Sequence, residues 1–335
     1  NTLNRAFQSY RQPGSSIKPL VVYTPAFERG YTPDTIVVDE PIEDGPKNAG
    51  IYSGAITIRT AVQYSKNTIA HKIFEALTPK VGMQYVLNMG FSKIMTQDTY
   101  NMASALGGLT YGVTTEEMAS GFCTIQNDGI YRDPNCIVQI LDAQGNVLVP
   151  NEWEEIRIYD RNACRMMTDV MVTVIAAGTG KGCGLSGIPC AGKTGTTNEE
   201  KDGWFVGYTS YYTTAVWVGY DQPEQVPNGT NPAAILWRKV MQPIHQGKAR
   251  SVLYDASAFR TVAVCLDSGK LATNACHNDA RGINRVAYVN VYPGDEPEGT
   301  CDKHVQVEYC YSGGGVANEY CALYGDVGIT SLVKL

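Results

Sequence analysis

Three β-rich segments follow one another closely in the second half of the chain, and this succession limits the possible folds more than any other feature. The segments run over residues 189–196, 203–209 and 212–219, and turn-forming residues separate them. Strands joined by such short links are usually antiparallel, because a parallel pair needs a long crossover connection. The chain is therefore expected to contain an antiparallel sheet.

Helical patterns on both sides of these segments supply the layers that would flank the sheet. Residues 57–77 carry apolar side chains at the spacing of a single helix face. Residues 161–177 form a second amphipathic pattern that ends at two glycines, and residues 233–246 are expected to form a closing helix. Thr114 and Glu117 have the spacing of a capping box at the start of a further helix. The predicted fold class is α+β, with an antiparallel sheet flanked by helices.

The composition changes after residue 248, which suggests a second and smaller domain. A chain of 335 residues is long enough for one large domain and a small one. The later residues are rich in Cys, Gly and Tyr and contain only short strand-like runs, such as 261–266 and 285–292. We predict one domain over residues 1–248 and a small C-terminal appendage over residues 249–335.

The ten cysteines suggest an oxidising, extracytoplasmic environment. No C-x-x-C pair occurs and the four histidines are scattered, so the spacing disfavours a metal site, and neither a metal nor a cofactor is predicted. Disulfides explain the cysteines better. Cys183 and Cys190 could close a short disulfide loop. In the appendage the candidate pairs are Cys265 with Cys276 and two of Cys301, Cys310 and Cys321.

Charge and hydropathy argue against two classes of partner. The formal net charge is −6 and no run of basic residues occurs, so no nucleic-acid partner is expected. No apolar stretch approaches the roughly 18 to 20 residues that a membrane-spanning helix needs. The hydrophobic content of 44% is enough for a sizeable core.

Two polar motifs in the first 70 residues point to nucleophilic chemistry. A turn at Pro13 and Gly14 places Ser15 at the start of a helix, and Lys18 follows one turn later on the same face. The Lys amine can therefore reach the Ser hydroxyl, and the helix N-terminus favours developing negative charge. In the second motif, Ser65-Lys-Asn67, the hydroxyl could move a proton and the amide could hold a substrate peptide group.

A third motif, Lys193-Thr-Gly-Thr196, lies on the first predicted strand. Strand alternation places Lys193 and Gly195 on one face and Thr194 and Thr196 on the other. A glycine at this position would let a substrate backbone lie close to the strand. Each motif taken alone occurs by chance, and its lysines and serines could equally be surface or capping residues. Their order, spacing and flanking sequences carry the argument.

With their flanks, these motifs resemble the transpeptidase domain of class A (bifunctional) penicillin-binding proteins. S-x-x-K, S-D-N and K-T-G mark penicillin-binding proteins and class A β-lactamases, and here Lys66 stands at the Asp position of the middle motif. The similar stretches are NRAFQSYRQPGSSIKPL, YTPDTIVVDEP, YSGAITIRTAVQYSKNTIAHKI, ALGGLTYGVTTEEMASGF, AAGTGKGCGLSGIPCAGKTGTTNEEKDGWFVGYT and CLDSGKLATNAC. The resemblance implies the penicillin-binding and β-lactamase-like transpeptidase fold over residues 1–248.

The resemblance also implies a function and a place in the cell. It implies a serine D,D-transpeptidase that cross-links peptidoglycan stem peptides ending in D-Ala-D-Ala through an acyl-enzyme, and that β-lactam antibiotics inhibit covalently. The enzyme would act at the extracytoplasmic face of the bacterial cell membrane. In the family, two strands of the sheet, a glycosyltransferase domain and a membrane anchor precede the serine, whereas fourteen residues precede Ser15 here. The sequence is therefore expected to be a fragment, with membrane attachment only through a missing N-terminal anchor.

Residue roles follow from the same resemblance. Ser15 would be the nucleophile, Lys18 its base, and Ser65 the proton relay to the leaving amine. Asn67 would bind the substrate amide. The substrate carboxylate would be held by Lys193, Thr194 and Thr196, and Gly195 would be a substrate-binding residue through its backbone. The backbone N–H groups of Ser15 and Thr196 would form an oxyanion hole.

Two alternatives remain open. In a D,D-carboxypeptidase or a β-lactamase, water would take the acyl group instead of an amine. Neither Glu116 nor Glu117 is a convincing base for that water. In a non-enzymatic β-lactam sensor, acylation would occur without turnover, although all three motifs are intact here.

Overall fold

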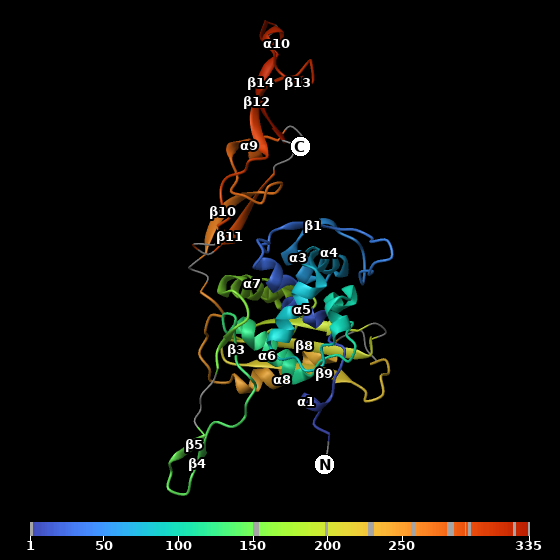
Figure 1. Cartoon of the computed structure of the whole chain (residues 1–335), viewed down its shortest axis with the longest axis vertical. Coiled ribbons are helices and arrows are strands. Elements are labelled where there is room, and N and C mark those ends of the chain that lie inside the picture. Colours follow the sequence, from blue (N-terminus) through green and yellow to red (C-terminus); the bar gives the residue numbers. More distant parts are fainter. Residues whose placement is uncertain are drawn as a thin grey trace. The chain divides into compact units, whose positions relative to one another are not determined.

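The chain divides into two compact units (Figure 1). The large unit comprises Asn1–Pro33 and Val37–Tyr254, and the small unit comprises Asp34–Ile36 and Asp255–Leu335. The structure, a computed structural model, describes residues 3–149, 154–197, 200–226, 231–255, 259–279, 285–291, 293, 296–323 and 326–333. Each unit has its own clusters of buried apolar side chains.

A three-stranded antiparallel sheet forms the framework of the large unit. Its strands are β7 (Ala191–Thr196), β8 (Asp202–Tyr208) and β9 (Thr213–Gly219), in the order β7-β8-β9. The register pairs Gly195 with Trp204 across β7 and β8. The antiparallel sheet expected from the three β-rich segments is confirmed.

Helices cover both faces of this sheet. Successive side chains of β8 point to opposite faces, so neighbouring residues of this strand contact different helices. On one face Phe205 packs against Trp237 of α8 (Pro232–Ile244), with ring centroids 5.0 Å apart. On the other face Trp204 belongs to the main apolar cluster, together with residues of α6 (Thr115–Gln126) and α7 (Arg161–Ala177). This arrangement confirms the α+β class and the helices expected near 161–177 and 233–246.

The prediction of a single helix over residues 57–77 is wrong in one respect, because this segment forms two helices. α3 (Ile58–Gln63) and α4 (Asn67–Leu77) are separated by a short break. Within the break Ser65 has a φ of 57°, in the left-handed region that helices of L-residues do not use. The apolar stripe continues on both sides, with Ala61 and Ile69 fully buried.

The other elements of the large unit are short, apart from α5 (Pro79–Asn88). β1 pairs with β2, β3 with β6 and β4 with β5. Among the described residues, none of the helices has both the length and the hydrophobicity that crossing a membrane requires. The remaining bounds, with η marking 3₁₀ and π helices, are α1 (Arg5–Gln8), η1 (Gly14–Ile17), η2 (Pro19–Tyr23), α2 (Thr24–Phe27), β1 (Ile36–Asp39), β2 (Gly54–Thr57), η3 (Thr96–Thr99), η4 (Met102–Leu106), β3 (Ile130–Tyr131), β4 (Ile140–Leu141), β5 (Val147–Val149) and β6 (Ile156–Arg157).

The small unit contains two further antiparallel sheets. β10 (Arg260–Cys265) pairs with β11 (Val286–Val291), as expected from the strand-like runs; residue 292, the end of the second run, lies outside the described residues. β12 (His304–Cys310) lies between β13 (Gly315–Val316) and β14 (Val327–Val333). Two short helices, α9 (Asn274–His277) and α10 (Glu319–Leu323), complete the unit.

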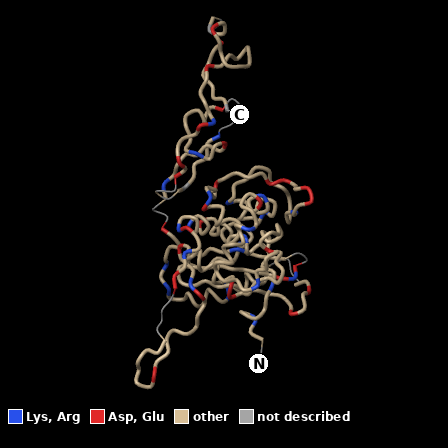
Figure 2. Tube along the Cα trace, viewed as in Figure 1, with Lys and Arg blue, Asp and Glu red and all other residues tan. Residues whose placement is uncertain are grey.

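Charged residues of both signs alternate along the chain of each unit (Figure 2). Several form ion pairs within the large unit, such as Arg165 with Asp128 at 2.9 Å and Lys72 with Glu40 at 2.7 Å. Exposed pairs of this kind contribute little to stability, typically about 0 to 1 kcal/mol each. The charge distribution therefore gives each unit a mixed surface.

All ten cysteines are thiols in the structure. The disulfide expected between Cys183 and Cys190 is therefore not formed, although both residues lie in one apolar cluster. Burial raises the pKa of Cys183 to about 11 and also raises that of Cys190. Both thiols are thus kept protonated and unreactive.

Candidate active site

The segment that carries Ser15 packs tightly against β7. Gly14 adopts a φ of 53°, and a Cβ atom there would lie 2.6 Å from the carbonyl oxygen of Thr196. A Cβ on Gly195 would lie 2.9 Å from the hydroxyl oxygen of Ser16. The missing side chain of Gly195 therefore allows the chain's own serine-bearing segment to lie close to the strand. From the sequence, a substrate backbone was expected at this place.

A second segment closes around the same turn. The side chain of Gln12 exchanges two hydrogen bonds with the backbone of Leu109, at 2.6 and 2.8 Å. Gly107 has a φ of 82°, and a Cβ there would collide with the backbone of Gly14. Sequence reasoning missed this contact, although the ALGGLTYG stretch signalled it through its glycines.

Ser15 lies in the first turn of η1 and is partly exposed. Among the described residues, its hydroxyl has no hydrogen-bond partner, while the hydroxyl of the next residue, Ser16, is buried and donates to Pro13 O at 2.7 Å. Ser15 is thus the serine of this turn that is available to a reactant.

Lys18 is completely buried and forms three hydrogen bonds with uncharged acceptors. Its Nζ donates to Asn67 Oδ1 at 2.7 Å, to the carbonyl oxygen of Ser65 at 3.1 Å and to that of Lys66 at 3.4 Å. Burial, and secondly the positive charge of Lys193, hold the pKa of Lys18 well below its ordinary value of 10.5. In the neutral form the amine keeps two N–H donors for these three acceptors and gains a lone pair that can accept a proton.

Lys193 of β7 is also completely buried, and its Nζ donates to Ser65 Oγ at 2.9 Å and to Thr194 O at 3.0 Å. Burial lowers its pKa from 10.5 to about 7. Ser65 therefore connects the two lysines, since it accepts from Lys18 with its carbonyl and from Lys193 with its hydroxyl. Its left-handed backbone turns both oxygens to these partners, and such strain is common at functional sites.

Asn67 is already engaged within the protein. Its Oδ1 accepts from Lys18, and its Nδ2 donates to Lys47 O at 2.8 Å. Asn67 therefore orients the Lys18 amine, while binding of a substrate amide stays a prediction.

The threonines of β7 lie apart from this hydrogen-bonded cluster. The Thr194 hydroxyl is 2.6 Å from that of Thr179, and Thr196 is exposed at the end of the strand. Strand alternation predicted one shared face for Lys193 and Gly195; in the structure Lys193 donates to Ser65, and Gly195 lies against Pro13 and Ser16 of the serine-bearing segment. Carboxylate binding by the threonines stays a prediction, as does the oxyanion hole.

A buried carboxylate that sequence reasoning missed fixes the second motif. Asp39 accepts hydrogen bonds from Asn48 and Thr68, both at 2.6 Å, and from Ser53 N at 2.8 Å, and it forms an ion pair with Lys66 at 3.1 Å. Burial alone would raise the pKa of Asp39, but these partners outweigh it and lower the pKa to about 2. Lys66 is thereby held at Asp39. The VVDEP stretch around Asp39 was the available signal.

Comparison with known families extends over both units. Residues 1–242 match the family described as "Penicillin binding protein transpeptidase domain", and residues 258–306 match "Penicillin-binding protein 1A, C-terminal domain". Penicillin-binding protein 1A of Clostridium perfringens is 30% identical over 329 residues, which cover 91% of this chain and 39% of that protein. Penicillin-binding protein 4 of Bacillus subtilis is 33% identical over 246 residues, which cover 71% of this chain and 39% of that protein. The chain thus spans well under half the length of these relatives.

Solved structures show the same fold. Penicillin-binding protein 1A from Haemophilus influenzae superposes with a TM-score of 0.71 at 24% identity, over 89% of this chain and 50% of that one. The PonA1 protein from Mycobacterium tuberculosis, solved in complex with penicillin V, superposes with a TM-score of 0.66 at 25% identity, over 75% of this chain and 73% of that one.

Proposed function

Because the chain belongs to the penicillin-binding protein transpeptidase family, as a class A member, we propose that it is a serine D,D-transpeptidase with Ser15 as its nucleophile. The observation that supports this most is the pair of buried lysines joined through Ser65, one of which, Lys18, follows the partly exposed Ser15 by one turn. Among the described residues neither amine has a carboxylate hydrogen-bond partner, and few other roles would compensate for burying two amines in this way.

In the first half of the proposed reaction, Ser15 Oγ attacks the carbonyl carbon of the penultimate D-alanine of a stem peptide. Its proton passes to the neutral amine of Lys18. The bond to the terminal D-alanine then breaks, and the leaving amine takes a proton through the Ser65 hydroxyl. The products are an ester on Ser15 and free D-alanine.

In the second half, an amine of a neighbouring stem peptide attacks this ester and loses a proton, and Ser15 recovers its own. The backbone N–H groups of Ser15 and Thr196 would stabilise the oxyanion in both halves, and each such donor typically supplies about 2.7 to 4 kcal/mol. Lys193, Thr194 and Thr196 would bind the substrate's terminal carboxylate.

A β-lactam would enter the same pathway and stop at the ester. When its ring amide opens, the leaving nitrogen stays attached to the adduct and blocks the acceptor. The penicillin V complex of the PonA1 protein supports this proposal. We also propose that the chain acts at the extracytoplasmic face of the bacterial membrane, where peptidoglycan lies.

A β-lactamase is less favoured because hydrolysis needs a base to activate water. Glu117 is occupied in a capping box with Thr114 and also binds Ser92, and Glu116 is exposed in the first turn of α6. A D,D-carboxypeptidase would use the same residues and differ only in its acceptor.

The test is intact mass spectrometry of the chain after incubation with a fluorescent penicillin. We expect a single stoichiometric adduct that is lost in Ser15→Ala. Ser16→Ala is the matched control, since Ser16 is buried in the same turn, and this variant should still form the adduct. An adduct that persists in Ser15→Ala would refute Ser15 as the nucleophile.

Turnover separates the remaining alternatives. Incubation with a peptide ending in D-Ala-D-Ala should release D-alanine, and an added acceptor amine should be incorporated into the product. Release with water as the sole acceptor would identify a carboxypeptidase. Acylation by penicillin without any release would identify a sensor.

A further inference from the structure

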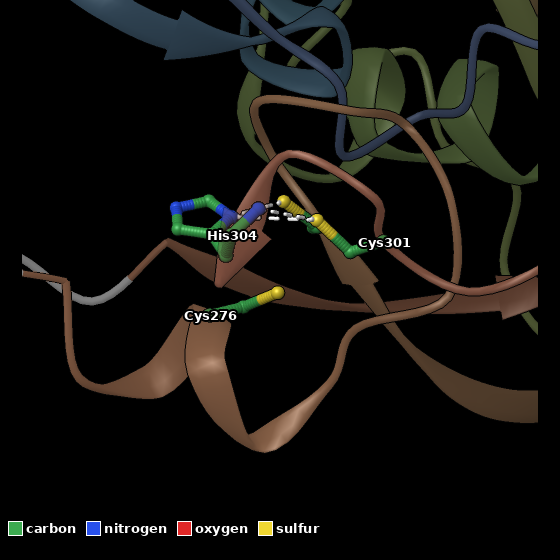
Figure 3. Close-up of side chains that lie close together, drawn as sticks. Cys276, Cys301 and His304 are labelled. Carbon is green, nitrogen blue, oxygen red and sulfur yellow. Dashed lines mark hydrogen bonds between the residues drawn. The ribbon is translucent and has the colours of Figure 1, made fainter. Parts of the chain in front are cut away.

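Three cysteines and one histidine of the small unit converge on a single point. Cys265 ends β10, Cys276 lies on α9, Cys301 lies shortly before β12, and His304 is the first residue of β12. All four are buried, and one ligand atom from each lies within 4.8 Å of the others. Figure 3 shows Cys276, Cys301 and His304 approaching one another from these separate segments.

The spacing of these atoms suits a tetrahedral metal ion. Zinc binds sulfur at about 2.3 Å and imidazole nitrogen at about 2.0 to 2.1 Å, so sulfur and nitrogen ligands on a tetrahedron are about 3.5 Å apart. In the structure His304 Nδ1 lies 3.3 Å from Cys265 Sγ and 3.4 Å from Cys301 Sγ. The four donors are therefore already close to the positions that one ion requires.

The surroundings of His304 match those of a metal-binding imidazole. Its Nδ1 faces the sulfurs, while its Nε2 lies 2.9 Å from Asp279 Oδ2 and 3.2 Å from Asp267 Oδ2. Metal-bound histidines almost always donate their second ring N–H to such an acceptor, which fixes the ring and the tautomer. Asp267 is itself held by two hydrogen bonds from Arg285, at 2.8 and 3.0 Å.

The sulfurs also accept hydrogen bonds from the backbone. The N–H of Thr273 points to Cys276 Sγ at 3.4 Å, and that of His304 points to Cys301 Sγ at 3.5 Å. Donors directed at sulfur stabilise the negative charge that a metal-bound thiolate retains.

We propose that Cys265, Cys276, Cys301 and His304 bind one Zn²⁺ ion in a closed structural site. Three thiolates and one imidazole form one of the standard sets of structural zinc ligands, and four protein ligands leave no position open for a substrate. The proposal replaces both the expectation of no metal and the candidate Cys265–Cys276 disulfide.

A disulfide explains this cluster less well. It would join two of the three sulfurs and leave the third thiol buried beside an imidazole whose other nitrogen is held by two carboxylates. Cys310 and Cys321 differ, since they hydrogen-bond to each other without a histidine in the cluster. The ion also has a physical role, because the apolar clusters of the small unit hold only a few side chains.

The test begins with metal analysis of the full chain, purified without chelators. Inductively coupled plasma mass spectrometry should find about one zinc per chain. Cys276→Ser and His304→Ala should lose most of it. Cys321→Ser, a matched control in the same unit, should retain it. Equal zinc contents in the wild type and both ligand variants would overturn the proposal.

Two measurements on the wild-type chain keep the test informative if the variants fold poorly. After zinc is removed by a chelator under reducing conditions, added Co²⁺ should produce thiolate-to-cobalt charge-transfer and tetrahedral d–d absorption bands, and Zn²⁺ should abolish them. Peptide mapping without reduction should find Cys265, Cys276 and Cys301 unlinked. Absent cobalt bands, or a disulfide between any two of these cysteines, would refute the site. Penicillin acylation of Ser15 is independent of both results.

Discussion

Lys18 and Lys193 place two amines in the interior of the large unit, and their reactivity depends on keeping at least one of them neutral. In the part of the chain that the structure describes, neither amine forms a hydrogen bond with a carboxylate. Each cation therefore disfavours its neighbour, and burial disfavours both. Both amines are therefore shifted toward their neutral forms.

This arrangement predicts a pH dependence for acylation by penicillin. Lys18 must be neutral to accept the Ser15 proton. The pKa of Lys193 is about 7, and that of Lys18 is held well below 10.5. As the pH falls through the pKa of Lys18, the fraction with neutral Lys18 decreases and the second-order rate constant should fall, approaching tenfold per pH unit. The midpoint of this fall should lie well below pH 10.5.

The measurement is the rate of adduct formation with fluorescent penicillin between about pH 5.5 and pH 9. Circular dichroism at each pH controls for unfolding. In a folded chain, a rate constant that already falls tenfold per pH unit from pH 9 downward would show that the base keeps an ordinary amine pKa and would contradict this role of the buried Lys18.

The sequence predicted the residues of this cluster but could not predict their partners. Order and spacing identified Lys18, Ser65, Asn67 and Lys193, since the chemistry requires those residue types. It could not show that Asn67 orients Lys18, because that contact joins segments 49 residues apart. It also gave Asp39 no role.

At the scale of elements, the contact between η1 and β7 positions Ser15. Gly14 and Gly195 lie in that contact, one on each segment, and neither has space for a methyl group. The backbone of the serine-bearing turn therefore rests directly on the strand that carries Lys193.

Gly195→Ala should separate these two elements. The added methyl group would collide with the carbonyl oxygen of Pro13 and with the buried side chain of Ser16. We expect a loss of about 1 to 3 kcal/mol in the free energy of unfolding, as overpacking typically costs, and much slower acylation. Urea denaturation and adduct kinetics measure the two effects.

Gly184→Ala is the matched control, because a Cβ there would meet only Ile175 at an ordinary distance of 3.5 Å. It should leave both quantities nearly unchanged. Similar acylation rates for Gly195→Ala and Gly184→Ala would show that this contact does not position Ser15.

Periodicity predicted the elements better than their interruptions. The apolar stripe over residues 57–77 continues through both α3 and α4, since it reports which residues are buried. It does not report that a single residue, Ser65, adopts a left-handed φ and divides the helix. Backbone strain of this kind depends on tertiary partners, here Lys18 and Lys193.

At the scale of the whole molecule, the chain has two units with separate cores. The apolar clusters of the large unit contain the residues around the active site, whereas those of the small unit are few and adjoin the four proposed zinc ligands. Stability should therefore come from packing in one unit and largely from the metal in the other.

We expect two thermal transitions, one from each unit. A chelator should lower the midpoint of the small unit's transition alone, because its folding is coupled to metal binding. Differential scanning calorimetry with and without chelator measures this, with penicillin binding as the readout for the large unit. A single transition that the chelator shifts as a whole would contradict separate units.

From composition the sequence predicted a division near residue 248, which stays a prediction, and it did not predict the proposed zinc ligands. The prediction of no metal rested on the absence of C-x-x-C pairs, whereas the local pattern that indicates a metal site here is Cys301-x-x-His304. The other two ligands come from β10 and α9, and only the folded chain brings them to this pair.

The glycines around Ser15 limit which mutations this part of the protein can accept. Any substitution at Gly14, Gly107 or Gly195 adds atoms where neighbouring protein atoms already stand. Mutations at these glycines therefore cannot change the shape of the site without also displacing the segment that carries Ser15. Under antibiotic selection, variation should therefore fall on side chains that face outward, such as that of Thr196, and not on these glycines.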